Sequence, residues 1–267
     1  MLKKMEKKKK FLKVGDKIVF RSSVDGLEYD LEPGVVYTIE INRYTDEVNL
    51  IIGKPFNMPS KIYTTPQDDK FVNKVINSYK TADSNTLGVM LSGLKGSGKT
   101  LLSKVIAMKS ELPIIVIDNY IHPKILNKVL KSFEGVEVCI LFDEVDKNGE
   151  DYDDNYLLRI LDGVENTGKK MMLFTANEGE DINQYMKDRC SRIRYWREFE
   201  EVPASLIIAM LEDKLNDKSK CKELTDFIQD NFSCISFDNV LAFANEVNNN
   251  PDDAFEELFE DMNLSKK

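Results

Sequence analysis

The chain has 267 residues, of which 42% are apolar and 31% charged, and its formal net charge is −9. These values are ordinary for a globular protein, and the length allows two or three domains. The negative balance argues against a protein that coats nucleic acid through its overall field, although a local basic surface remains allowed. The four cysteines show no CxxC spacing and there is one histidine, so neither a disulfide framework nor a zinc site is supported.

The chain starts with the lysine-rich stretch MLKKMEKKKK. We expect residues 1–10 to be a disordered, solvated start, with a phosphate-binding arm as the alternative. No apolar run approaches the roughly 18 residues that span a bilayer, and the start lacks the pattern of a secretory signal. We therefore expect a cytoplasmic protein with no membrane partner.

Residues 11–60 contain short β-rich pieces: KIVFR, VVYTIEI and EVNLIIG. Turn signals separate them, including Val24-Asp25-Gly26 and Glu32-Pro33-Gly34. Strands at this spacing predict a small, barrel-like β-rich N-terminal domain over residues 11–60. Pro55 and Pro59 then indicate a linker, because proline removes a backbone donor and favours extended geometry before it.

The pattern changes in residues 61–200. PQDDKFVNKVINSY has apolar residues at helical spacing and acids in its first turn, which predicts a helix. Five apolar strands follow: LGVMLSG, PIIVID, VEVCILFDE, KMMLFTAN and RIRYW. We expect helices between them, from Lys99, over about 123–132, around NYLLRILDGV and near 181–188. Continuous apolar strands with intervening helices predict a parallel sheet covered on both faces.

After Pro203 the sequence has helical patterns only: SLIIAMLEDKLN, ELTDFIQDNF, SFDNVLAFANEVN and DDAFEELFEDM. We expect residues 201–267 to form a small helical domain.

The segment from Gly93 to Thr100 matches G-x-x-x-x-G-K-T, with a predicted strand before it and a helix after it. Its glycines allow backbone angles that turn successive amides toward phosphate oxygens, and the helix points its positive end to the same place. Lysine adds charge for the β- and γ-phosphates, and the threonine hydroxyl ligates Mg²⁺. We expect nucleotide binding by Gly93, Leu94, Lys95, Gly96, Ser97, Gly98, Lys99, Thr100 and Leu101.

A second motif, VEVCILFDEVD, brings the chain to the carboxyl end of a buried strand, where open α/β sheets bind ligands. There Asp143 is expected to hold Mg²⁺ together with Thr100, and Glu144 to orient and deprotonate the attacking water. An acidic turn after a strand is common by itself, but after a phosphate-binding loop it indicates a hydrolytic site.

Two further features fit this interpretation. Asn177 ends the strand KMMLFTAN, where its amide is suited to position the lytic water; strand capping is the alternative. Arg189 and Arg192 lie three residues apart in MKDRCSRIRYW. Arginine matches phosphate oxygens and, supplied from a neighbouring subunit, stabilises transition-state charge. Ordinary surface salt bridges are the alternative.

At this point the sequence resembles the AAA+ ATPase family, especially its AAA branch, over roughly residues 60 to 250. GLKGSGKT resembles the Walker A loop, CILFDE the Walker B segment and Asn177 the sensor-1 residue. DRCSRIRY resembles the stretch with two arginine fingers, although Cys190 and Ser191 replace a proline and a glycine. The stretch LRILDGVENTGKKMMLFTANE is similar to AAA proteins encoded by large bacteriophages.

The resemblance implies an α/β fold: a P-loop NTPase parallel-sheet core of AAA+ type with a C-terminal helical lid. It also implies a ring homo-oligomer, commonly of six subunits, with ATP and Mg²⁺ between neighbours and Arg189 or Arg192 reaching across. Hydrolysis would then move the lid and remodel a bound macromolecule.

Two departures limit what is carried over. Only Tyr120-Ile121 stands where an aromatic-hydrophobic-glycine pore loop is usual, and a structural tyrosine is as good an interpretation as a gripping one. No arginine follows Arg197, so the lid lacks a sensor-2 arginine, which favours protein remodelling over DNA loading. A nucleic-acid-associated ATPase and an ATP-gated scaffold with little turnover remain the alternatives, and the sequence does not name the substrate.

Overall fold

The structure is a computed structural model. It describes residues 31–41, 48–82, 86–118, 121–145, 168–177, 193–264 and 266–267, and the backbone of 11–14 and 17–20. The chain divides into two compact units, Met1–Glu32 and Pro33–Lys267.

The first unit contains β1 (Phe11–Val14) and β2 (Lys17–Phe20), which pair in antiparallel fashion and form a two-stranded sheet. We predicted the second of these strands. The segment that forms the first, FLKV, was not among the predicted strands.

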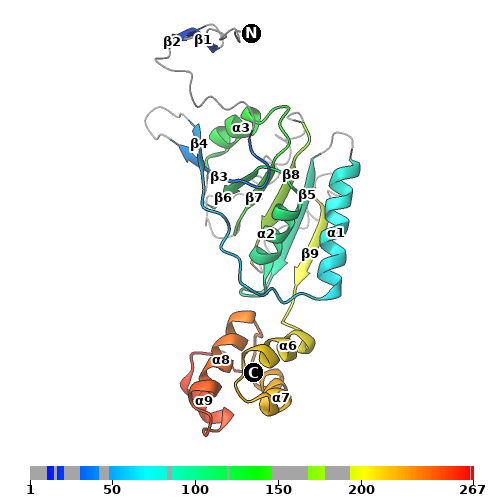
Figure 1. Ribbon diagram of the computed structural model, residues 1–267, viewed down its shortest axis with the longest axis vertical. Helices are drawn as coiled ribbons and strands as arrows, with labels where there is room; N and C mark the ends of the chain where they lie inside the picture. Colours follow the sequence, from blue (N-terminus) through cyan, green and yellow to red (C-terminus); the bar gives the residue numbers. More distant parts are fainter. Residues whose placement is uncertain are drawn as a thin grey trace, which may run out of the picture. The chain divides into compact units, whose positions relative to one another are not determined.

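The second unit is built on a seven-stranded sheet with the order β4-β3-β6-β7-β8-β5-β9 (Figure 1). Five neighbouring strand pairs are parallel, and only the edge strand β4 runs antiparallel to its neighbour. The strands are β3 (Val36–Ile41), β4 (Val48–Ile52), β5 (Leu87–Gly93), β6 (Ile114–Ile117), β7 (Cys139–Phe142), β8 (Met171–Thr175) and β9 (Ile193–Phe199).

The predicted N-terminal domain over residues 11–60 is wrong for β3 and β4, because both strands extend the main sheet. Val36, Tyr37 and Thr38 pair in parallel with β6, and Val36 and Tyr37 are buried. The spacing of turn signals identified these strands correctly but gave no information about their partners, which depend on contacts far apart in the sequence. The unit that contains the core sheet therefore begins at Pro33 rather than at residue 61.

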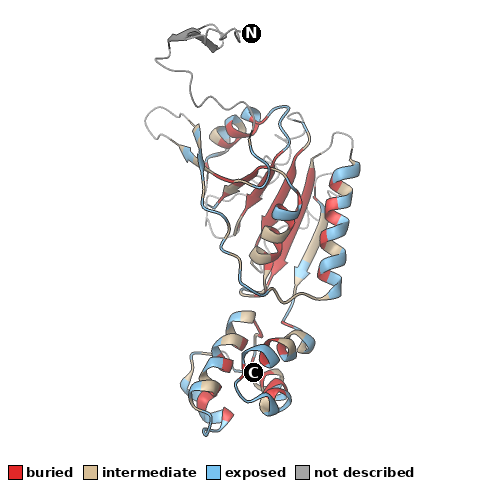
Figure 2. Ribbon diagram, viewed as in Figure 1, coloured by how far each residue is buried: buried red, intermediate tan, exposed pale blue. Residues whose placement is uncertain are grey.

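Helices α1 (Pro66–Thr81) and α2 (Lys99–Lys109) contact the sheet and each other, and α3 (Pro123–Ser132) connects β6 to β7. Every residue of β5, β7 and β8 is buried, so side chains on both faces of the central strands are covered, as predicted. Figure 2 shows these central strands as the buried layer of the unit.

Local sequence explains where α1 begins. Thr65 and Asp68 form a capping box in which each side chain accepts a hydrogen bond from the other residue's backbone amide, and Pro66 occupies the first turn. The predicted apolar face of this helix is buried against the sheet through Val72, Val75, Ile76 and Tyr79.

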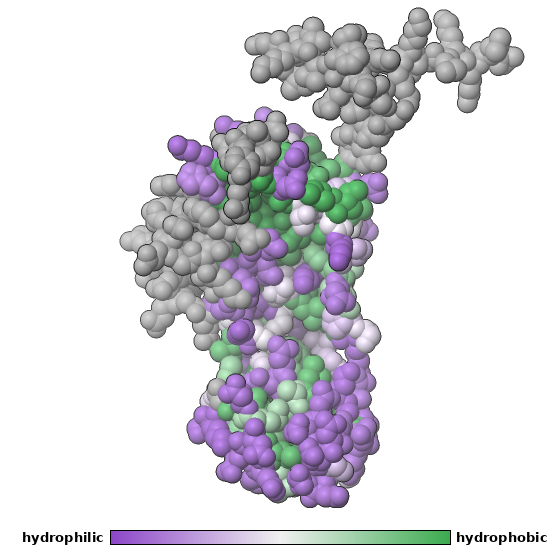
Figure 3. Space-filling view, turned by 90° about the vertical axis from the view of Figure 1, so that its left-hand side faces the viewer, coloured by the Kyte–Doolittle hydropathy of each residue, from purple (hydrophilic) through white to green (hydrophobic). Residues whose placement is uncertain are grey.

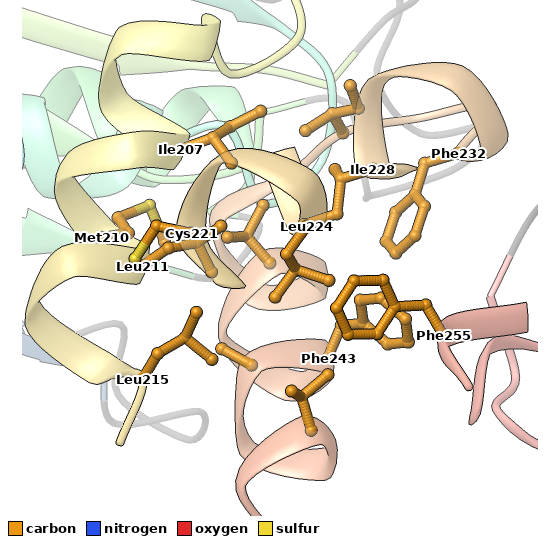
Figure 4. Close-up of a cluster of buried hydrophobic side chains, with 14 of the residues drawn as sticks. Ile207, Met210, Leu211, Leu215, Cys221, Leu224, Ile228, Phe232, Phe243 and Phe255 are labelled. Carbon is orange, nitrogen blue, oxygen red and sulfur yellow. The ribbon is translucent and has the colours of Figure 1, made fainter. Parts of the chain in front are cut away.

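The C-terminal segment is helical, as predicted, and has its own apolar core (Figure 4). Phe232, Phe243 and Phe259 pack together there, with the rings of Phe232 and Phe259 stacked at 4.8 Å between centroids. The outer surface of this segment is mainly hydrophilic in the view of Figure 3. Its helices are α6 (Ala204–Lys214), the 3₁₀ helix η2 (Lys218–Lys220), α7 (Cys221–Asn231), α8 (Phe237–Asn249) and α9 (Phe255–Asp261).

The helices predicted around NYLLRILDGV and near 181–188 lie outside the described residues. Among the helices that the structure does describe, none combines the length and the apolar character needed to cross a membrane.

Candidate functional site

The loop between β5 and α2 holds the predicted phosphate-binding motif. Gly93, Gly96 and Gly98 all have positive φ angles, of 126°, 74° and 96°. A Cβ atom on Gly93 would lie 2.0 Å from the carbonyl oxygen of Phe199, and the amide of Leu94 donates to that same oxygen over 3.0 Å. The loop therefore lies directly against the backbone of β9, and no side chain fits at Gly93.

Polar groups converge inside this loop. The N-cap of α2 is Gly98, which has no side chain to bond the first amides of the helix, so the helix presents its partial positive charge to the loop. The Lys99 ammonium is buried and donates to the carbonyl oxygens of Gly93 and Leu94 over 2.7 and 2.6 Å. The Ser97 hydroxyl is buried without a hydrogen-bond partner among the described residues.

The second motif lies beside the first at the carboxyl edge of the sheet. Asp143 and Glu144 directly follow β7, and the hydroxyl of Thr100 donates to Oδ1 of Asp143 over 3.0 Å. Glu144 has a φ of 51°, a left-handed conformation that is unfavourable for a residue with a Cβ atom and is typical of strained functional sites.

Thr175, the last residue of β8, is a site residue that the sequence pattern did not predict. Its hydroxyl donates to Oδ1 of Asp143 over 2.6 Å and accepts the amide of Glu144 over 2.8 Å. Thr175 lies two positions before Asn177, and its strand β8 is the neighbour of β7. This position in the sequence is the signal that could have identified it.

Asn177 is half-buried and lies two residues after β8, at the same edge of the sheet as Asp143. Its role as a water-positioning residue stays a prediction. Arg189 and Arg192, and with them the predicted arginine fingers, lie outside the described residues, as does Tyr120.

A pocket next to the loop was also missed. It is lined by the segment before α1, by Ser97, Gly98 and Leu101, by residues that follow β9, and by Leu206 and Phe237 of the C-terminal helices. The spread of these residues over the chain explains why no local motif indicated the pocket.

The C-terminal helices contact the loop at the start of α8. The amide of Phe237 donates to the carbonyl oxygen of Gly96 over 3.0 Å, and a Cβ atom on Gly96 would lie 2.9 Å from Cβ of Ser236. The Phe237 ring lies 3.3 Å from where a Cβ atom of Gly98 would be. A change in the loop backbone therefore alters the contacts that the loop makes with the start of α8.

A second contact joins the C-terminal helices to the segment before α1. The hydroxyl of Tyr63 donates to Asp213 of α6 over 2.6 Å, and Lys61 forms an ion pair with the same carboxylate at 3.0 Å. Burial and then the hydrogen bond to Asp213 raise the pKa of Tyr63 to about 12, whereas the bonds from Tyr63 and Lys61 hold the pKa of Asp213 below its ordinary value.

These residues fit a polyphosphate with a divalent cation. Three features suit an anion: the helix start with a glycine N-cap, the buried ammonium of Lys99, and the Ser97 hydroxyl, which has no hydrogen-bond partner in the described part of the chain. The hydroxyl of Thr100 and the carboxylate of Asp143 are oxygen donors 3.0 Å apart, which is the donor chemistry that Mg²⁺ prefers.

Comparison with known proteins agrees with this geometry. Residues 89–198 match the family model described as "ATPase family associated with various cellular activities (AAA)". The matched segment covers less than half of the chain, and over that segment the sequence is similar to AAA ATPase domains. The match starts in β5 and ends in β9, so the matched segment includes the loop, both motifs and the two predicted fingers.

The fold is that of AAA+ P-loop proteins. A solved structure described as "Structural Basis for Katanin Self-Assembly" aligns with a TM-score of 0.52 and 14% sequence identity, over 74% of this chain and 73% of that chain. A search of curated proteins gave no match. Neither finding supports the predicted bacteriophage origin.

The contact at Gly93 gives a direct test of the loop geometry. We expect Gly93→Ala to lower the free energy of unfolding by at least about 4 kcal/mol, because the Phe199 carbonyl must move. Gly34→Ala is the matched control: its φ is 75°, but no atom of the described residues lies within 4 Å of the added Cβ, so only the left-handed cost of about 1–2 kcal/mol applies. Urea unfolding measures both, and equal losses would contradict the close approach.

The Tyr63–Asp213 contact predicts a pH dependence. Because the pKa of Asp213 is depressed in the folded protein, its contribution to stability is present above the unfolded pKa of about 3.9 and is lost as the pH falls through the folded value. We therefore expect Tyr63→Phe to destabilise the protein at pH 7 and progressively less in acid.

The control for this experiment is Tyr195→Phe, which removes a hydroxyl bonded to the neutral Ser78 at 2.5 Å. Its effect should stay constant over the same pH range. Urea midpoints from pH 7 to pH 3 measure both variants, and a Tyr63→Phe effect that does not change with pH would be the contradicting result.

Proposed function

We propose that this protein is a Mg²⁺-dependent ATP hydrolase that works as a ring homo-oligomer and remodels a macromolecular partner, most favourably a protein. The observation that carries the proposal is the meeting of Thr100, Asp143 and Glu144 at the carboxyl edge of the sheet, beside a glycine loop that contains a buried lysine. Within an AAA ATPase domain this arrangement supports hydrolysis rather than binding alone.

The loop and the start of α2 bind the phosphates. Loop amides and the Lys99 ammonium bind the β- and γ-phosphate oxygens, and the Thr100 hydroxyl and the Asp143 carboxylate hold the metal ion. When bound, Mg²⁺ neutralises charge that develops on the phosphate oxygens. Lys99 exchanges its bonds to the Gly93 and Leu94 carbonyl oxygens for bonds to phosphate, so its charge remains paired.

The carboxylate of Glu144 accepts a proton from the attacking water, and the amide of Asn177 orients that water. Glu144 is suited to this role because its backbone is held in one conformation at the sheet edge rather than in a mobile turn. Such preorganisation reduces the cost of aligning the reacting atoms.

The base of the nucleotide occupies the pocket next to the loop. Its apolar lining includes Leu101, Leu206 and Phe237, which are suited to the faces of a planar ring. Because Leu206 and Phe237 belong to the C-terminal helices and Leu101 to α2, nucleotide in this pocket contacts both parts of the unit. Binding and release are thus coupled to the position of those helices.

The active form is a ring, hexamer-like, in which Arg189 or Arg192 of one subunit contacts the γ-phosphate bound by its neighbour. Self-assembly is stated for katanin, whose structure shares the fold, and the resemblance of DRCSRIRY to a finger-bearing stretch supports the same kind of association here. Arginine in this position stabilises transition-state charge.

The partner class is proposed from the C-terminal helices. Ser236, Phe237 and Asp238 lie nearest to Gly96 and Gly98 of the loop, and the sequence after Arg197 contains no arginine. This agrees with protein remodelling. A nucleic-acid-associated ATPase is the second candidate, supported by the basic groove on α3 lined by Lys124, Lys128 and Lys131. That candidate requires hydrolysis to be stimulated by DNA or RNA and the stimulation to vanish at high salt.

Glu144→Gln tests the hydrolytic role. The variant should bind ATP as tightly as the parent, because the phosphate contacts remain, but its turnover should fall at least about 100-fold without the general base. Fluorescent-ATP titration and phosphate release measure the two quantities. Near-normal turnover would contradict the assignment, and turnover too low to measure in the parent would favour the ATP-gated scaffold.

Mixing variants tests the shared site. Glu144→Gln subunits retain their arginines, and Arg189→Ala/Arg192→Ala subunits retain Glu144, so neither alone should hydrolyse ATP at the normal rate. In mixed rings an intact Glu144 can meet an intact arginine across an interface, and phosphate release should recover partly. No recovery at any mixing ratio would contradict a site shared between subunits.

A further inference from the structure

Thr175 is a buried residue at the end of β8 that contacts both carboxylate-bearing residues of the site. We propose that Thr175 is a positioning residue for ATP hydrolysis, whose single hydroxyl fixes the carboxylate of Asp143 and the backbone of Glu144 at the same time. The inference rests on the proposed function and deepens it.

The two hydrogen bonds of Thr175 have fixed directions. The Asp143 carboxylate can only accept, so the Thr175 hydroxyl donates its one proton to Oδ1 over 2.6 Å. The lone pairs of the same oxygen then accept the amide of Glu144 over 2.8 Å. A side chain in this place must donate and accept at once, which serine or threonine can do and valine cannot.

The backbone of Thr175 adds a third bond. Its carbonyl oxygen accepts the amide of Val145 over 2.9 Å, so the amides of Glu144 and Val145 are both held by one residue. The two amides flank the Cα atom of Glu144, whose φ is 51°. A conformation that is unfavourable for glutamate persists only when its surroundings determine it, and Thr175 supplies two of the contacts that do so.

The same oxygen of Asp143 also accepts from Thr100. Thr100 belongs to the phosphate-binding loop motif and Thr175 to β8, so Asp143 is oriented from two sides. Thr175 therefore links the metal-binding pair, Thr100 and Asp143, to the residue that activates water. None of these contacts requires Thr175 to touch the nucleotide.

A merely structural hydroxyl is the competing explanation, because buried hydroxyl groups are normally hydrogen-bonded whatever their function. The two explanations differ in their consequences. A structural hydroxyl affects stability, whereas a positioning residue affects the dependence on Mg²⁺ and the turnover number at unchanged affinity for metal-free ATP.

Thr175→Val is the test, since valine has nearly the same shape and neither donates nor accepts. We expect turnover to fall about 10- to 100-fold and the Mg²⁺ concentration for half-maximal activity to rise, the range usual for residues that orient metal ligands. The affinity for fluorescent ATP in EDTA should be unchanged. Thr175→Ser keeps both hydrogen bonds and should restore most of the turnover.

A second measurement needs no nucleotide. Hydrogen exchange of the Glu144 amide should accelerate about 10-fold or more in Thr175→Val, because that amide loses its acceptor. The control is Thr225→Val in α7: Thr225 is equally buried, but its hydroxyl donates only to the Cys221 carbonyl oxygen. This variant should change neither turnover, Mg²⁺ dependence nor Glu144 exchange.

The outcomes separate this inference from the proposed function. A parent protein that hydrolyses ATP, together with a Thr175→Val variant of unchanged turnover and Mg²⁺ dependence, overturns the positioning role and leaves the ATPase intact. A parent protein without turnover contradicts the proposed function, and unchanged Glu144 exchange in Thr175→Val would then overturn the positioning contact independently.

Discussion

The close approach of Gly93 to Phe199 is the constraint on which the site depends. Because Gly93 has a hydrogen atom in place of a side chain, the end of β5 can lie against the end of β9. The amide of Leu94 then donates to the Phe199 carbonyl oxygen. This fixes where the phosphate-binding loop starts. It also joins that loop to the strand from which the chain continues into the C-terminal helices.

Within the Pro33–Lys267 unit, the C-terminal helices contact both this loop and the segment before α1. The start of α8 bonds to Gly96, and the Phe237 ring contacts Gly98, while Tyr63 bonds to Asp213 of α6. Under the proposed function, nucleotide in the adjoining pocket contacts the β5–α2 loop and the C-terminal helices together. An ATPase that performs mechanical work needs such a connection, because hydrolysis is useful only when loss of a phosphate changes a contact elsewhere.

The sequence predicted most of the elements and both motifs, because strand runs, helical periodicity and the loop pattern are local properties. It predicted β5 with both of its ends. The pattern of strand, loop and helix also predicted roles for Lys99 and Thr100, and these roles stay predictions. The partners of β3 and β4, and the hydrogen bonds of Thr175, were not predictable in this way. They follow from sheet register, in which Phe142 pairs with Phe174, so that Asp143 and Thr175 become neighbours.

The central claim is that one loop and one sheet edge form a Mg²⁺-ATP site. A crystal structure of the Glu144→Gln variant with Mg²⁺ and ATP tests it most directly. We expect phosphate oxygens on the amides of the β5–α2 loop, the metal ion on Thr100 and beside Asp143, and the base near Phe237. Nucleotide bound elsewhere, or a metal ion held without Thr100 and Asp143, would contradict the account.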